Sequence, residues 1–369
     1  MKQVTLERLH CTTTEDWTGA DSCRLEIFAD GELEHAFRAE LDDGMIWPLN
    51  TSLLFEREVT VRLYDEDGGL PGDDDDALGI VSIPAADTGP MVGAFTQDDA
   101  AYELSYHVVD RADLAAFDRV ELELQAFEAS PAPGVWPNIA KADLVADMRA
   151  TIADPVRQVD QVNSQFCGPT SIVFELVRRM PRRYVRLCRA LFETGTFHSR
   201  THAVTASADL RAASTGQGMS VADWMLVATM RESENAVFGV DPNASGPLAG
   251  MQGMTTHWEM EGWTSEVLLK QHTAISTTFL WGEMDAIRYA EQVFAAGGVA
   301  FVMVHADLLS GDESSFVPPW PTHWVVYDGG LAEWDGRIAF NVYTWGSKRA
   351  VSVSAERFEA CMFGIVTGF

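Results

Sequence analysis

The chain has 369 residues, of which 47% are hydrophobic, and its 55 acidic and 26 basic residues give a formal net charge of −29. This length predicts two domains of ordinary size, and the negative charge argues against nucleic acid as a partner. No apolar run reaches the roughly 18 residues that span a bilayer, and the amino terminus lacks a secretory signal pattern. We therefore expect a cytoplasmic protein, or one exported by a signal-peptide-independent route.

Short runs of alternating polar and apolar residues occupy the first third of the chain. Examples are RLEIF, EVTVRLY, GIVSI, YELSYHVV and RVELELQAF, separated by Gly, Asp and Pro. Period-two alternation at this spacing predicts an all-β antiparallel sandwich over residues 1–129. The same segment holds 30 acidic and 8 basic residues, so most of the negative charge of the chain belongs to it.

The stretch EASPAPGVWPN at 128–138 contains three prolines, which disfavour both helix and central strand, and predicts a linker over 130–138. Strand patterns return only near the carboxyl end of the chain. Helices followed by a small sheet predict a second, α+β domain over residues 139–369. Helical periodicity precedes those strands at 139–152, 168–180, 182–192, 221–232 and 283–296.

Carboxylates gather in two loops of the first segment. Glu15, Asp16 and Asp21 precede one predicted strand. Asp65 and Asp67 end a second predicted strand, and Asp73 and Asp76 lie before a third. Carboxylates at such spacing suit a hard cation with six to eight oxygen ligands, such as calcium. The alternative is a solvated acidic turn that keeps the protein soluble and protects an edge strand.

The two acidic loops, together with WPLNTSLLF between them, resemble the C2 domain, a calcium- and phospholipid-binding β-sandwich. The resemblance covers roughly residues 1–129 and implies calcium as a cofactor, with Asp16, Asp21, Asp65, Asp67 and either Asp73 or Asp76 among the ligands. It also implies an acidic membrane surface as a partner, reached by Trp17 and Leu70 at the loop tips. Trp17 packed on its own loop is the competing interpretation.

The stretch QVNSQFCGPTSIVFELVRRM at 161–180 places a cysteine where a loop gives way to a helix. Gly168 and Pro169 suit a first helical turn, and the apolar stripe after them predicts a buried helix. Cys167 is therefore expected at a helix amino terminus, where unpaired amides lower the pKa of a thiol. The alternative is an inert buried thiol, as expected for Cys188.

Two further segments supply groups for thiol chemistry. Gln161 precedes Cys167 and offers an amide donor for an oxyanion, in competition with Gln158 and Gln165. His323 begins a strand that is followed by a turn, expected near Leu331, and by a second strand. Antiparallel pairing about that turn brings His323 opposite residues 340–344, with Asn341 within reach. Asp328 and Asp335 lie too far along the strands to orient His323.

Gln161, Cys167-Gly168, His323 and Asn341 in this order, with Trp345-Gly346 after them, resemble papain-like cysteine peptidases, including the bacterial peptidases that remove double-glycine leaders. The resemblance implies a catalytic Cys-His-Asn triad that hydrolyses a peptide or isopeptide amide, with no cofactor needed for catalysis and a protein or peptide as substrate. Tyr343 stands at the position of the family's asparagine, so the third member is either Asn341 or Tyr343.

The expected function is thus a papain-like cysteine peptidase with a calcium-responsive targeting domain, a pairing that fits a bacterial toxin or effector. The same triad also fits a peptidoglycan amidase, a glutamine deamidase or an acyl transferase. The competing class is a non-catalytic calcium- or membrane-binding adaptor. The five scattered cysteines, with no Cys-x-x-Cys pair, are expected to be free thiols.

Overall fold

The structure is a computed structural model that describes residues 1–15, 20–66, 75–111, 119–160, 166–214, 218–234, 255–277, 282–310 and 320–369. The chain forms two compact units, Met1–Leu122 and Glu123–Phe369. The helices in the described part of the chain include none that is long and apolar enough to cross a membrane.

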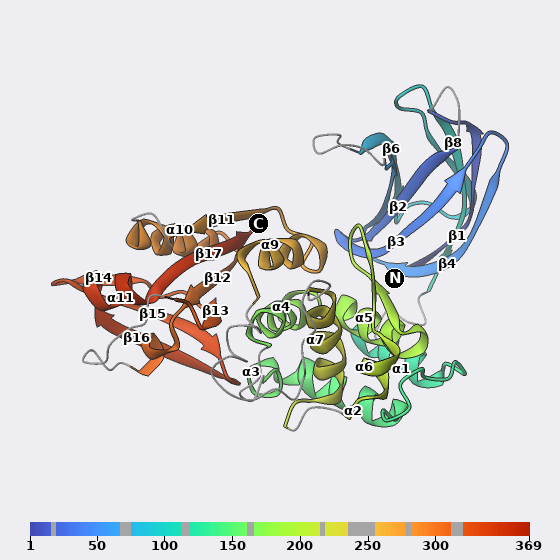
Figure 1. The fold of residues 1–369 in the computed structure, drawn as a ribbon. Coiled ribbons are helices and arrows are strands. Elements are labelled where there is room, and N and C mark those ends of the chain that lie inside the picture. Colours follow the sequence, from blue (N-terminus) through green and yellow to red (C-terminus); the bar gives the residue numbers. More distant parts are fainter. Residues whose placement is uncertain are drawn as a thin grey trace. The chain divides into compact units, whose positions relative to one another are not determined.

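The first unit is a β-sandwich of two four-stranded antiparallel sheets (Figure 1). One sheet has the order β4 (Ile46–Phe55), β1 (Lys2–Thr13), β8 (Ala101–Asp110) and β7 (Gly89–Phe95). The other has the order β3 (Glu32–Leu41), β2 (Asp21–Ala29), β5 (Glu58–Asp65) and β6 (Asp76–Pro84). The all-β sandwich expected from the alternating pattern is confirmed.

A single hydrophobic core joins the two sheets of the sandwich. Alternate residues of β5, Val59, Val61 and Leu63, are fully buried and meet residues of β1 such as Leu6 in the same cluster. The residues between them on β5 are partly exposed. Period-two alternation therefore reports which face of each strand is turned inward.

The last stretch interpreted as a strand, RVELELQAF, is instead helix α1 (Arg119–Ala129). Leu124 and Phe127 are its buried side chains, and they follow Val120 by four and seven residues. The alternating pattern therefore also satisfies helical spacing, and its Glu, Leu, Gln and Ala residues are good helix formers. The boundary between the units lies inside α1 rather than at Ala129.

Residues 130–138, expected as a linker, pack onto the second unit. Trp136 is buried, and its indole N–H donates to the carbonyl of Leu191 at 2.8 Å. A Cβ at Gly134 would overlap the ring of Phe192. Proline prevents regular structure in this stretch, but it does not prevent close packing.

Helices form the first part of the second unit, as the periodicity predicts. The order is α2 (Lys141–Ala153), α3 (Pro155–Gln158), α4 (Cys167–Arg179), α5 (Pro181–Thr194), α6 (Ala208–Ala212), α7 (Val221–Glu234) and α9 (His257–Glu266). A short hairpin, β9 (Thr196–His198) and β10 (Ala203–Thr205), lies between α5 and α6.

An antiparallel sheet forms the rest of the unit. Its order is β11 (His272–Ser276), β17 (Met362–Gly368), β12 (Val299–Val304), β13 (His323–Tyr327), β15 (Arg337–Thr344) and β14 (Ala332–Trp334), and β16 (Ser347–Ser354) also pairs with β15. Three further elements accompany the strands: α10 (Glu283–Ala295), the 3-10 helix η2 (Ala306–Ser310) and α11 (Ala355–Cys361).

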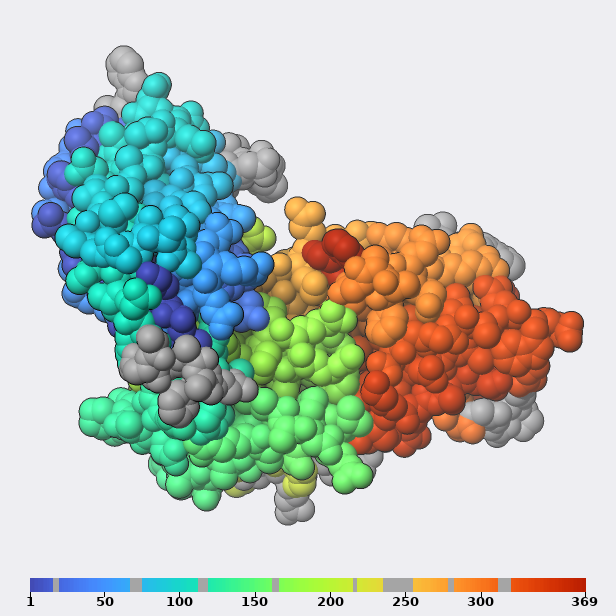
Figure 2. Space-filling model, turned by 180° about the vertical axis from the view of Figure 1, so that it is seen from behind, coloured from blue at the N-terminus to red at the C-terminus, as the bar shows by residue number. Residues whose placement is uncertain are grey.

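Both faces of the central strands are covered. Ala300, Val302 and Val304 of β12 join Ile287 and Ala290 of α10 in one buried cluster. On another side, α4 packs against β13 and α9 packs against β17 (Figure 1). The helices α2 to α5 (green) and the sheet with α10 and α11 (orange to red) occupy adjoining parts of this unit (Figure 2). This arrangement brings the start of α4 to the sheet.

Candidate active site

Helix α4 begins at Cys167, as the sequence predicts. The Cys167 residue is 5% exposed, and no described side chain caps the first turn of the helix. A Cβ at Gly168 would overlap the side chain of Thr255, so only glycine fits at this position without a shift of its neighbour. The sulfur is thus held at a helix amino terminus inside the protein.

Helix α4 is buried up to Val177, which fixes its position. Residues from Cys167 to Val177 are all buried, and Phe174 stacks on Tyr343 of β15 with ring centroids 3.4 Å apart. Glu175 is the one charged residue in this buried stretch. Its carboxylate accepts a hydrogen bond from Arg178 at 2.8 Å and forms an ion pair with Arg179. A helix packed on all sides places its first residue reproducibly.

The start of β13 lies against the cysteine. The backbone N–H of Trp324 interacts with the Cys167 thiol, together with the N–H of Gly168. The indole N–H of Trp324 donates to the carbonyl of Thr255 at 2.7 Å, and its ring makes an edge contact with His257. Trp324 directly follows His323. The residue expected to act as the base is therefore next in the chain to the residue whose N–H contacts the sulfur.

His323 is 4% exposed and held on two sides. Its Nε2 lies 2.6 Å from the Oγ1 atom of Thr344, and its ring stacks on Trp345 with centroids 4.7 Å apart and an interplanar angle of 15°. These contacts fix both the orientation of the ring and the nitrogen that Thr344 engages. Thr344 was not among the site residues expected from the sequence.

Asn341 does not lie at His323. Val326 pairs with Tyr343 and Tyr327 with Val342, and the carbonyl of Asn341 accepts from the N–H of Asp328 at 2.8 Å. Asn341 is therefore opposite a residue five positions from His323, about 16 Å along the strand. Its exposed side chain lies beside Gly330 instead.

The error in register has an identifiable cause. The turn that reverses the chain before β15 is at Asp335 and Gly336, which both have positive φ, and β14 pairs with β15 across it. The turn was expected near Leu331. An Asp-Gly pair is a strong signal for a tight hairpin turn. A turn at this later position shifts the pairing toward the end of β15, where Nε2 of His323 contacts Thr344 instead of Asn341.

Tyr343, the other candidate for the third member, also lies away from His323. Its hydroxyl donates to the carbonyl of Val159, and its ring stacks on Phe174. Adjacent strand residues project from opposite faces, so Tyr343 and Thr344 reach different sides of β15. Tyr343 joins the sheet to α4 and takes no part in holding the imidazole.

The site residues are electrically neutral near pH 7, contrary to the expectation of a lowered thiol pKa. Burial raises the pKa of Cys167, and the N–H groups of Trp324 and Gly168 oppose this effect only in part. Burial, together with the positive charge of Arg349, lowers the pKa of His323 to about 4. Desolvation disfavours the charged form of each group and outweighs the helix terminus.

A buried ion pair close to Cys167 was also not expected from the sequence. The side chains of Arg231 and Glu234 on α7 pair with each other and are 4% and 1% exposed. The charge of Arg231 favours the thiolate of Cys167, and that of Glu234 opposes it. Two opposite charges three residues apart on a helix are the sequence signal for such a pair.

Gln161, expected as the oxyanion donor, lies outside the described residues. The same holds for three of the expected metal ligands, Asp16, Asp67 and Asp73, and for the loop-tip residues Trp17 and Leu70.

The remaining expected ligands lie at one end of the sheet that contains β2, β5 and β6. Asp65 pairs with Asp76 across β5 and β6, and Cys23, two residues after Asp21, pairs with Asp65. Asp21 is fully buried and accepts the N–H of Glu15 and, at 2.5 Å, the hydroxyl of Tyr102. Asp21 therefore serves the interior of the sandwich.

A different trio of carboxylates meets at this end of the sandwich. One oxygen each from Glu15, Asp76 and Asp98 lies within 4.8 Å of the other two. Asp98, in the loop between β7 and β8, was not among the expected ligands. Three carboxylates with oxygen as the sole donor atom match the preference of a hard cation such as calcium.

Among solved structures, C2 domains are similar to part of the chain. No family model matches the chain, and no curated protein matches it. A solved C2 domain is 15% identical with a TM-score of 0.25, and the match covers 30% of this chain and 100% of that one. A C2 domain of plant extended synaptotagmin 1 is 12% identical with a TM-score of 0.22, covering 29% and 90% of the two chains.

The calcium-bound pair of C2 domains of extended synaptotagmin 2 is 14% identical, with a TM-score of 0.22 and coverage of 36% of this chain and 53% of that one. The assignment of the first unit as a β-sandwich does not depend on these matches, because it follows from the strand pairing given above.

Proposed function

We propose that the protein is a cysteine hydrolase of the papain-like type, which cleaves a peptide or isopeptide amide with Cys167 as nucleophile and His323 as base. The observation that carries the proposal is the contact between the Cys167 thiol and the backbone N–H of Trp324, the residue after His323. Thiol catalysis requires a base within hydrogen-bond reach of the nucleophile, and we assign this role to His323, which directly precedes Trp324.

The neutral states of both groups define the first chemical step. His323 removes the thiol proton while the Cys167 sulfur bonds to the carbonyl carbon, so the imidazole acts as a general base. His323 then returns the proton to the leaving amine as the C–N bond breaks. Water activated by His323 releases the acid from the thioester and regenerates the thiol.

Thr344 takes the positioning role that the papain-like resemblance gives to an asparagine. Its hydroxyl contacts Nε2 of His323, which leaves Nδ1 as the nitrogen that exchanges protons with the substrate. The backbone N–H of Cys167 is the oxyanion donor on the described chain, and Gln161 remains the proposed second donor. Peptidoglycan amidase, glutamine deamidase and acyl transferase are the other reactions that this set of groups supports.

A thiol probe separates this enzyme from a non-catalytic adaptor. Iodoacetamide labelling is mapped by mass spectrometry, with the fully buried Cys188 as the internal control. The enzyme predicts that Cys167 is labelled faster than Cys188 at alkaline pH. It also predicts that the wild type cleaves peptides of a proteome-derived library that the Cys167→Ala and His323→Asn variants do not cleave. Identical cleavage profiles for the wild type and Cys167→Ala would overturn the proposal.

A calcium-binding role for the first unit is a second proposal, and it is carried by the trio of Glu15, Asp76 and Asp98. These residues would hold the ion at the end of the sandwich where β6 begins. A bound cation would offset most of the repulsion among the three carboxylates and would offer its open coordination positions to the phosphates of an acidic membrane surface.

A further inference from the structure

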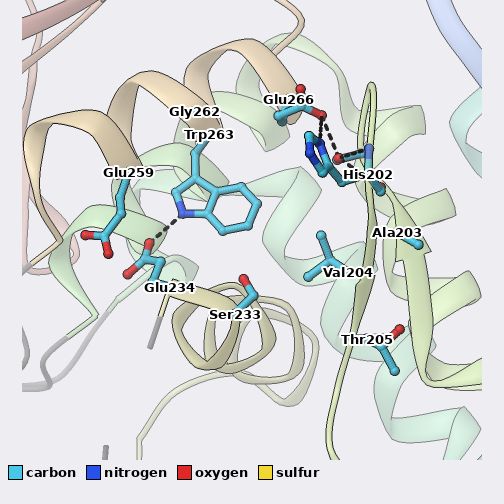
Figure 3. A pocket seen from close by; sticks show the side chains of 11 residues that line it. His202, Ala203, Val204, Thr205, Ser233, Glu234, Glu259, Gly262, Trp263 and Glu266 are labelled. Atoms are coloured by element: carbon cyan, nitrogen blue, oxygen red, sulfur yellow. Dashed lines mark hydrogen bonds and ion pairs between the residues drawn. The ribbon is translucent and has the colours of Figure 1, made fainter. Parts of the chain in front are cut away.

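A pocket with a volume of about 360 Å³ lies in the second unit, beside α7 and α9 (Figure 3). Its walls come from three places: the end of α7, the face of α9 around Trp263, and the hairpin of β9 and β10. The lining residues that matter here are Val204, Glu234, Glu259, Trp263 and Glu266.

Carboxylates are the main charged groups of the pocket wall, and two of them have partners: Glu234 pairs with Arg231, and Glu266 lies 3.6 Å from His202. Three glutamates line the pocket, and among the described residues its lining contains no lysine and no arginine. Figure 3 shows Glu234 and Glu259 at one side of Trp263 and Glu266 at the other. The indole and Val204 supply apolar surface between them.

The carboxylates are held in place by neighbouring groups. Trp263 donates its indole N–H to Glu234 at 2.5 Å, and Glu259 caps α9 through the backbone N–H of Thr256. Burial acts to raise the pKa of Glu266, but hydrogen bonds from Thr201 and Ser199 lower it below the usual range. A preorganised anionic wall loses little entropy when a ligand binds.

The pocket is connected to Cys167 through one residue. The hydroxyl of Thr255 donates to Glu234 at 3.3 Å, and the Thr255 side chain fills the space beside Gly168, the residue after the nucleophile. The charge of Glu234 also acts on the Cys167 thiol. A group bound in the pocket is therefore close to the start of α4.

We propose that this pocket binds the side chain of a lysine or arginine of the substrate, with its aliphatic stem along Trp263 and Val204 and its cationic end at the glutamates. The proposal rests on the proposed hydrolase function and adds the substrate class. Long basic side chains carry an apolar stem and a charged end, and a cation is attracted by the face of an indole. An anionic side chain is repelled by the carboxylates, and an uncharged apolar one desolvates them without supplying a further hydrogen bond.

The test measures binding apart from catalysis. The Cys167→Ala protein is titrated with Nα-acetyl-lysine methylamide, and binding is followed by saturation-transfer NMR. The norleucine analogue, which lacks the ammonium group, and the Nε-acetylated analogue serve as neutral ligands. The proposal predicts that the lysine compound binds at least about tenfold more tightly than either, and that salt weakens its binding.

Glu259→Gln is the variant that tests the pocket itself. Glutamine at this position retains the capping box of α9, and loss of one charge-assisted hydrogen bond weakens lysine binding by about tenfold. Glu261→Gln is the matched control, because Glu261 is on the same helix, pairs with His272 and does not line the pocket. It is expected to bind like the parent protein.

Equal binding of the lysine and norleucine compounds, or unchanged lysine binding in Glu259→Gln, would overturn the proposal. These results are independent of whether the protein is a hydrolase, because the Cys167→Ala protein carries out no turnover. Failure of the hydrolase proposal is read instead from the cleavage profiles. If cleavage is found without preference for basic residues, the hydrolase stands and the basic-residue pocket is rejected.

Discussion

Nε2 of His323 lies 2.6 Å from Oγ1 of Thr344, and both residues are buried. This contact replaces the histidine–asparagine pair that the sequence led us to expect. A hydroxyl can accept from Nε2–H or donate to Nε2, so it holds the ring without adding a charge to the site. The uncharged partner is consistent with a histidine whose pKa is lowered by burial.

Substitution of Thr344 by valine tests its positioning role. Valine keeps the shape of threonine and removes the hydroxyl, so we expect kcat/KM to fall by up to about 100-fold while KM changes little. Thr344→Ser retains the hydroxyl and is expected to restore most of the activity. Asn341→Ala is the control and is expected to behave like the wild type. Loss of activity in Asn341→Ala with full activity in Thr344→Val would contradict this assignment.

The low pKa of His323 predicts a specific pH dependence. NMR titration of ring-labelled protein, assigned with His323→Asn, is expected to show this imidazole uncharged down to about pH 5, with a midpoint at about 4. The unfolded chain binds a proton near pH 6.5. The stability that neutral His323 contributes is therefore present above about pH 6.5 and lost as the pH falls toward 4.

The measurement that checks the sign is the difference in unfolding free energy between wild type and His323→Asn. We expect the wild type to become more stable relative to His323→Asn as the pH rises from 4 to 6.5. A midpoint for His323 at or above 6.5 would show that the imidazole is solvated or paired with an anion, and would rule out the neutral pair.

The raised pKa of Cys167 predicts slow alkylation at neutral pH. Its iodoacetamide reaction is expected to accelerate only as the pH rises above the usual range of a thiol, with Cys167→Ala as the background. Addition of a substrate-like peptide aldehyde, which engages the site, provides protection. Rapid alkylation that is independent of pH between 5 and 8 would instead indicate a preformed thiolate.

Calcium binding to the sandwich is tested by removal of the carboxylate of Asp98. Asp98 has φ of +54°, a conformation that asparagine also adopts, so Asp98→Asn removes charge without backbone strain. We expect it to weaken calcium binding by about tenfold, measured by calorimetry on chelator-stripped protein. Asp99→Asn, at φ of +57° and outside the trio, is the control. No heat from the wild type would exclude the calcium site.

Asp21 is expected to stabilise the sandwich without calcium. Its carboxylate accepts from the Tyr102 hydroxyl and from the backbone N–H of Glu15, so Asp21→Ala leaves buried donors without partners. We predict a loss of about 1–3 kcal/mol in unfolding free energy in the presence of chelator, measured by urea denaturation. If the variant differs from wild type only when calcium is added, Asp21 is a ligand and not a structural residue.

The local sequence pattern predicted most helices and strands correctly. It failed where the same residues fit both the strand period of two and the helical period. Val59, Val61 and Leu63 alternate inward on β5, as the sequence predicts. In α1, Val120, Leu124 and Phe127 satisfy helical spacing, while the glutamates between the apolar residues imitate a strand. Packing of Phe127 against Phe192, with centroids 5.6 Å apart, selects the helix.

The sequence by itself determined that Cys167 begins a buried helix, because Gly168, Pro169 and the apolar stripe after them act within a few residues of one another. Only the tertiary structure decided that Thr344 holds His323 and that burial raises the pKa of the thiol. Strand register depends on where the chain reverses, and desolvation depends on what covers a group. Both are set by residues far away in the sequence, so no local pattern contains them.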